Sequence, residues 1–177
     1  MKVHRILAAI IWSALLVGCG GLSSAQKQSA EVALKALRKI AVATKVSVSP
    51  ATYSPLVIET KAQTDEAVRI LPDGVLKEEL KEAADAYVDA QRAWDDALSE
   101  NLTKAYLFIS KDQLLGSSAV MKSLIPKYGL TGKKESDRGG GKVIEYEVFG
   151  TSDVLKAIWN KAEEHISKAE SALNSPK

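Results

Sequence analysis

Residues 75–98 read VLKEELKEAADAYVDAQRAWDDAL, and this segment carries the most regular helical pattern in the chain. Its apolar residues recur three or four positions apart, which is the spacing of one face of an α-helix. Charged residues fill most of the other positions, so the segment predicts an amphipathic helix with an apolar stripe about 33 Å long. The stripe consists of Leu76, Leu80, Ala84, Tyr87, Ala90, Trp94 and Leu98.

Three further segments show the same spacing and predict helices. The segment at 55–71 has a clear entry signal, with Ser54 as N-cap and Pro55 at the first helical position. Thr151 or Ser152 is expected to cap the helix at 153–173. The Pro-Asp-Gly turn at 72–74 is short, so the helices on either side of it should be antiparallel neighbours. The three predicted helices span residues 26–46, 55–71 and 153–173.

Residues 99–150 show no regular pattern. The apolar run at 106–109 fits either a helix or a strand, and residues 114–124 predict a short helix ended by Pro126. Residues 130–142 are rich in glycine and charge and predict a loop. Residues 143–149 alternate apolar and acidic side chains, which favours an extended segment that can form one strand of a small hairpin.

The composition agrees with closely packed helices. The chain has 177 residues, of which 46% are hydrophobic and only 6% aromatic, whereas a β-sandwich would need more β-branched and aromatic residues. Amphipathic helices must bury their stripes against one another. We therefore expect an all-α fold, an antiparallel bundle of about four helices, with residues 99–150 as an irregular crossover that can contain a short β-hairpin.

The N-terminus has the features of a bacterial export signal. Lys2 and Arg5 precede an apolar run of 12 residues at 6–17. A membrane-spanning helix needs about 20 such residues, so the run is too short for a stable anchor. It is typical of the central region of a secretory signal peptide.

The four residues Leu16-Val17-Gly18-Cys19 resemble the lipobox of bacterial lipoprotein precursors. The resemblance implies that a lipid is attached to the thiol of Cys19, that residues 1–18 are removed, and that fatty acids such as palmitate anchor the product. Residues 19–25 would then be the lipidated cysteine and a flexible tether, and residues 26–177 the helical domain.

The resemblance also implies a location, the cell envelope. Gly20 follows the cysteine, and the absence of Asp there favours the outer membrane, with the domain facing the periplasm. One alternative stays open. Small residues at 23–25 also fit an ordinary signal-peptidase site, and cleavage after Ala25 would release a soluble, secreted helical protein.

The charge balance argues against nucleic acid as a partner. Lys2 and Arg5 lie in the segment expected to be removed, which leaves 22 basic residues against 22 acidic ones. Binding to phosphates needs surplus positive charge.

One local cluster of basic residues is a candidate contact with anionic headgroups or cell-wall polymers, the alternative being a solvated loop. Only Glu135 and Asp137 oppose it. Its members are Lys122, Lys127, Lys133, Lys134, Arg138 and Lys142.

No catalytic, cofactor or metal site is predicted. His165 is the single histidine after residue 18, and zinc or haem needs several closely spaced ligands. Ser117 does not follow a strand in a Gly-x-Ser-x-Gly elbow. The glycine run before Lys142 lacks the spacing of a phosphate-binding loop.

The aromatic residues divide into two groups. Tyr87, Trp94 and Trp159 fall on predicted apolar stripes and are expected in the core. Four others fall in less regular segments, which makes them candidates for a binding surface. They are Tyr53, Tyr128, Tyr146 and Phe149.

The sequence thus favours a non-enzymatic, membrane-anchored module that binds an envelope protein, a lipid or an envelope polymer. A carrier of small apolar ligands is an alternative, and it would need a large apolar cavity. An enzyme that uses carboxylates alone would need two buried acids facing one cleft.

Overall fold

The computed structural model describes residues 21–99, 104–110, 113–115, 118–139 and 142–175. The predicted signal peptide and Cys19 lie outside the described residues. Within them the chain is mostly helical, as predicted, with five helices and four strands.

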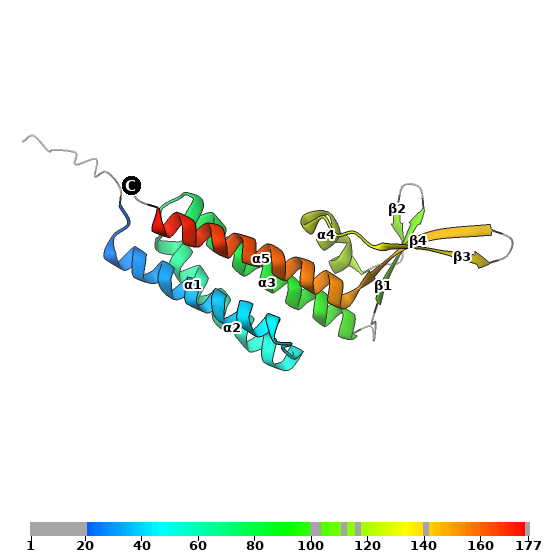
Figure 1. The fold of residues 1–177 in the computed structure, drawn as a ribbon, viewed down its shortest axis with the longest axis horizontal. Coiled ribbons are helices and arrows are strands. Elements are labelled where there is room, and N and C mark those ends of the chain that lie inside the picture. The colour runs from blue at the N-terminus through cyan, green and yellow to red at the C-terminus, as the bar shows by residue number, and fades with distance from the viewer. Residues whose placement is uncertain (1–20, 100–103, 111–112, 116–117, 140–141, 176–177) are drawn as a thin grey trace, which may run out of the picture.

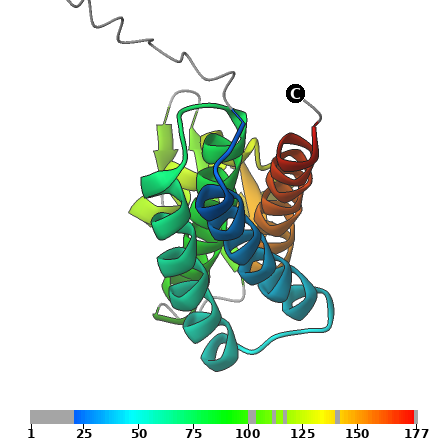
Figure 2. The same ribbon diagram turned by 90° about the vertical axis from the view of Figure 1, so that its left-hand side faces the viewer.

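The four long helices pack side by side, each antiparallel to the next (Figure 1). Gln26 near the start of one helix donates to the carbonyl oxygen of Ile70 at the end of the next. Trp94 and Trp159 meet late in the third helix and early in the last. Figure 2 shows α1 between α2 and α5. The helices are α1 (Ser24–Lys45), α2 (Pro50–Ile70), α3 (Val75–Ser99) and α5 (Thr151–Asn174).

The core between these helices is built mainly from alanine and branched aliphatic residues. Small side chains let the helices approach closely, and the larger ones fill the space between them. The α3 stripe holds as predicted at Leu80, Ala84, Tyr87 and Ala90, which are all buried, whereas Leu98 is exposed. The other large aliphatic residues that are less than 2% exposed are Leu37, Ile40, Leu124, Ile158 and Ile166.

Two predicted helix starts are wrong. Helix α2 begins at Pro50 with Ser49 as N-cap, so Pro55 lies inside the helix. The Ser-Pro entry signal occurs twice, and the chain uses the first. Helix α5 begins at Thr151, and Gly150 occupies the cap position without a side-chain hydrogen bond.

Residues 99–150 are more ordered than the sequence predicts. They contain α4 (Ala119–Tyr128) and a four-stranded antiparallel sheet in the order β2-β1-β4-β3. The loop predicted at 130–142 is wrong for most of its length, because residues 133–139 form a strand paired with residues 142–148. The strands are β1 (Lys104–Ser110), β2 (Gln113–Leu115), β3 (Lys133–Gly139) and β4 (Lys142–Gly150).

The sheet lies at one end of the helices, and the first described residues lie at the other (Figure 1). Helix α3 has 25 residues and therefore separates the two ends by about 37 Å. None of the helices in the described residues is long and apolar enough to cross a bilayer.

Candidate functional site

Helix α4 and the start of β3 position the four predicted basic residues whose side chains are described. Lys122 and Lys127 lie on α4, and Lys133 and Lys134 open β3. All four side chains are exposed, but they do not form one surface. Lys133 and Lys134 are adjacent in a strand and so point to opposite faces of the sheet.

The other two basic residues, Arg138 and Lys142, lie further along the hairpin of β3 and β4. In the register Arg138 is opposite Val143, and Lys142 is opposite Gly139. Their side chains are outside the described part of the structure.

Lys127 belongs to a polar cluster centred on Asp89, a residue of α3 that is only 6% exposed. The Lys127 ammonium donates to Asp89 Oδ2 at 2.7 Å, and the Tyr128 hydroxyl donates to the same oxygen at 2.9 Å. Arg92 Nη1 donates to Oδ1 at 3.2 Å. Burial and the hydrogen bond to Asp89 raise the pKa of Tyr128, so the hydroxyl keeps its proton. Lys127 is therefore an exposed cation that is already paired with a carboxylate of the protein itself.

The Asp89 cluster fixes the last turn of α4 against α3. The first turn is fixed separately, because Ser118 caps α4 and its hydroxyl donates to Asp96 of α3. Between these two points α4 buries Met121 and Leu124. Val120 and Ile125 also pack against the core, so α4 is held by an apolar face in its middle and by polar contacts at both ends.

An open groove of about 470 Å³ lies between the end of α4, the end of β4 and the first turns of α5. Its floor is apolar, and it contains one cation, Lys133, and one carboxylate, Asp153. A volume in this range fits a small ligand or part of a partner chain. Other lining residues are Tyr128, Leu130, Phe149 and Ala157.

Two glycines shape the segment between α4 and β3 that runs beside this groove. Gly129 has a φ of 59° and ends α4 in the left-handed conformation that favours glycine. A Cβ on Gly132 would lie 2.8 Å from Phe149 Cε2, so only glycine lets this loop approach β4 so closely. The buried Phe149 ring then separates the groove from the bundle interior.

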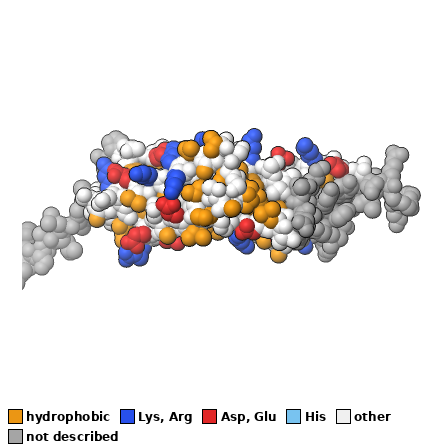
Figure 3. All heavy atoms as spheres, turned by 90° about the horizontal axis from the view of Figure 1, so that it is seen from below, with side chains coloured by type: hydrophobic (Ala, Val, Ile, Leu, Met, Phe, Trp, Pro, Cys, Tyr) orange, Lys and Arg blue, Asp and Glu red, His pale blue; other side chains and the backbone are white. Residues whose placement is uncertain are grey.

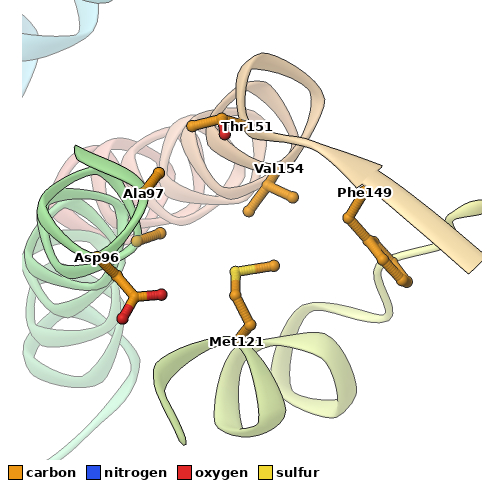
Figure 4. Close-up of a pocket in the computed structure, with 7 residues that line it drawn as sticks. Asp96, Ala97, Met121, Phe149, Thr151 and Val154 are labelled. Atoms are coloured by element: carbon orange, nitrogen blue, oxygen red, sulfur yellow. The ribbon is translucent and has the colours of Figure 1, made fainter. Parts of the chain in front are cut away.

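The cavity beside the groove is very small. It measures about 10 Å³ and lies between α3, α4 and α5, with Met121 and Val154 facing each other across it (Figure 4). The Asp96 carboxylate lies at its edge. This volume holds about one water molecule and no apolar ligand.

The aromatic residues are distributed differently from the prediction. Tyr53 and Phe149, predicted as surface candidates, are 1% and 4% exposed. Tyr53 donates to the Tyr87 carbonyl oxygen and accepts from Trp159 Nε1, both at 3.0 Å. Trp94 and Trp159 are half-buried against it, Tyr128 is half-buried in the Asp89 cluster, and the side chain of Tyr146 is not described.

Of the remaining chemical candidates, Ser117 and the glycines at 140–141 lie outside the described residues, and His165 pairs with a carboxylate. His165 Nδ1 lies 2.6 Å from Glu79 Oε2, in a half-buried pair that joins α5 to α3. In the part of the chain that the structure describes, no three histidine, cysteine or acidic residues are close enough to hold a metal ion.

Exposed apolar side chains are also present. Hydrophobic side chains gather over the middle of the face seen from below, with charged ones around them (Figure 3). The large exposed hydrophobic residues among those described are Val32, Val42, Val46, Ile58, Val75 and Leu98.

Comparisons of the chain with protein-family models, with curated proteins and with solved structures found no match.

Proposed function

We propose that the protein is a lipid-anchored bacterial envelope lipoprotein that acts as a non-enzymatic binding module. Its four long helices form one antiparallel bundle that serves as a spacer. The partner, an envelope protein or polymer, binds at the sheet end of that bundle, where α4, β3 and the groove beside them lie.

The observation that carries this proposal is the position of the first described residues. Leu22 packs against the core, and Ser23 caps α1 with a reciprocal bond to Gln26. Only Gly20 and Gly21 therefore separate Cys19 from the folded body, a reach of about 10 Å. A lipid on Cys19 holds this end of the bundle at the membrane, and the sheet lies at the other end of α3, whose 25 residues span about 37 Å.

This distance changes the partner expected for the basic residues. Electrostatic attraction is screened over about 8–10 Å at physiological salt. Lys122, Lys133 and Lys134 lie at the end far from the anchor, so they do not reach the headgroups of the anchoring membrane. We therefore favour a polymer or protein that approaches from the opposite side.

The cavities favour a binding module over a carrier of apolar ligands. Carriers enclose most of their ligand in a cavity of several hundred Å³. The cavity beside Met121 is about 10 Å³, and hollows of several hundred Å³ in the described residues, such as the one beside Lys133, are open to solvent.

Labelling with a palmitate analogue tests the anchor. The wild-type chain should take up the label and remain with membranes, whereas Cys19→Ala should do neither. A matched control, Cys19→Ala with Ser24→Cys, keeps one thiol but moves it out of the lipobox, and it should stay unlabelled. Equal labelling of wild type and Cys19→Ala, or a soluble wild-type product that begins at Gln26, would contradict the proposal.

A further inference from the structure

The outer edge of β3 is a long, regular row of backbone groups. Within the described residues β3 pairs only with β4, over seven consecutive positions without a bulge. The edge at the other side of the sheet, β2, is only three residues long. An unbulged edge of this length is the kind of surface to which a further strand adds through main-chain hydrogen bonds.

No register of β3 against a second copy of itself is complementary at every charged position. Centred on Ser136, two antiparallel copies put Lys134 opposite Arg138 and Glu135 opposite Asp137. Successive residues of a strand direct their N–H and C=O groups to opposite edges. Two antiparallel copies can therefore change register only by steps that keep residues whose backbone groups face the partner opposite each other. Of the two neighbouring registers, one puts Glu135 opposite Glu135 and Lys133 opposite Asp137, and the other puts Asp137 opposite Asp137. Like charges directly opposite destabilise a pair.

We propose that the β3 edge accepts an extended strand of a partner protein whose charges complement those of β3. Such a strand has acidic residues opposite Lys133, Lys134 and Arg138, and basic residues opposite Glu135 and Asp137. Lys133, Lys134 and Glu135 are all exposed at this edge, where an incoming strand meets them. The proposal does not depend on lipidation of Cys19.

A pair of synthetic peptides tests the proposal on the full chain carrying Cys19→Ala. Thr-Glu-Lys-Thr-Lys-Glu-Glu, aligned antiparallel to residues 139–133, puts an opposite charge at every charged position. Thr-Lys-Glu-Thr-Glu-Lys-Glu has the same composition and puts like charges opposite four of the five. The first should protect β3 amides from hydrogen exchange at a concentration at least tenfold lower than the second. Equal protection by both, or none at millimolar peptide, overturns the proposal.

A variant tests the same edge without a peptide. Asp137→Lys with Arg138→Glu makes the Ser136-centred pairing of two copies fully complementary. Residues 137 and 138 lie opposite Ile144 and Val143, so the exchange adds no like-charge pair to the existing ladder. This double variant should form concentration-dependent dimers in sedimentation, whereas Asp137→Glu with Arg138→Lys should stay monomeric. A monomeric double variant that retains the wild-type circular dichroism spectrum contradicts the assignment of an open edge.

Discussion

Asp89 is a buried carboxylate that accepts hydrogen bonds from three donors on two helices. A charge in a protein interior is stable only when its lone pairs are satisfied. Lys127 and Tyr128 supply two of those bonds from α4, so the residue couples the position of α4 to α3. Its effect on the groove is indirect, through the Tyr128 ring that lines it.

Replacing Asp89 by Asn should destabilise the protein by about 2 kcal/mol, because the amide removes the charge and turns one acceptor into a donor that faces either Arg92 or both Lys127 and Tyr128. Urea unfolding measures the difference. Asp95→Asn, an exposed position on the same helix, is the control and should change stability by less than about 0.5 kcal/mol. Equal effects of the two changes would show that the Asp89 cluster does not hold α4.

Replacement by Phe should have different effects on stability at Tyr53 and at Tyr87. The Tyr87 hydroxyl is buried and has no hydrogen-bond partner among the described residues, so Tyr87→Phe should leave stability unchanged or raise it. Tyr53→Phe removes two buried hydrogen bonds and should cost about 1–3 kcal/mol. Thermal unfolding of both variants compares them, and a larger loss in Tyr87→Phe than in Tyr53→Phe would contradict the assigned contacts.

At the scale of elements, the sequence predicts the helices, because their formation follows the local spacing of apolar residues. The long helices follow from apolar spacing, and their existence and order agree with the structure. The predicted start at Pro55 fails because the same Ser-Pro signal occurs five residues earlier. Strand β3 fails for a different reason, because KKESDRG has no apolar alternation and becomes a strand only through its pairing with β4.

The candidate site was less predictable than the helices. The sequence identifies the basic residues but not their separation, since the opposite directions of Lys133 and Lys134 depend on β3. The sequence contains one signal for the Asp89 cluster. Asp89 lies three residues after Ala86 and four before Ala93, a spacing that places it on the buried face of α3. A charged residue at that spacing indicates a partner from another element.

Gly132 tests how the loop between α4 and β3 reaches the sheet. Gly132→Ala introduces a Cβ 2.8 Å from the Phe149 ring, which is buried and has little room to move. The expected loss is about 1–3 kcal/mol, with faster hydrogen exchange in β3. Gly21→Ala is the control, because no atom lies within 4 Å of its added Cβ. If the two alanine variants melt at the same temperature, the close approach of this loop is incorrect.

At the scale of the whole molecule, three tyrosines link stability to alkaline pH. Burial raises the pKa of Tyr53, Tyr87 and Tyr128 above the ordinary value near 10. A raised folded-state pKa contributes stability that is complete below about pH 10 and is lost as the pH rises further. These three should therefore form phenolate only as the helices unfold, which ultraviolet absorbance and circular dichroism measure together. Titration of all five tyrosines near pH 10 with the helices intact would contradict their burial.

The arrangement of the two ends gives the molecule its proposed role, a bundle held by its first residues at a membrane with a sheet at the far end. The most direct measurement compares fluorophores at two introduced thiols on chains lipidated at Cys19 and bound to vesicles with quenching headgroups. A label at Asp73→Cys, a turn residue 97% exposed near the anchored end, should be strongly quenched. A label at Lys134→Cys on the sheet should keep its full emission. Equal quenching at both positions would contradict an upright bundle that holds its sheet away from the lipid.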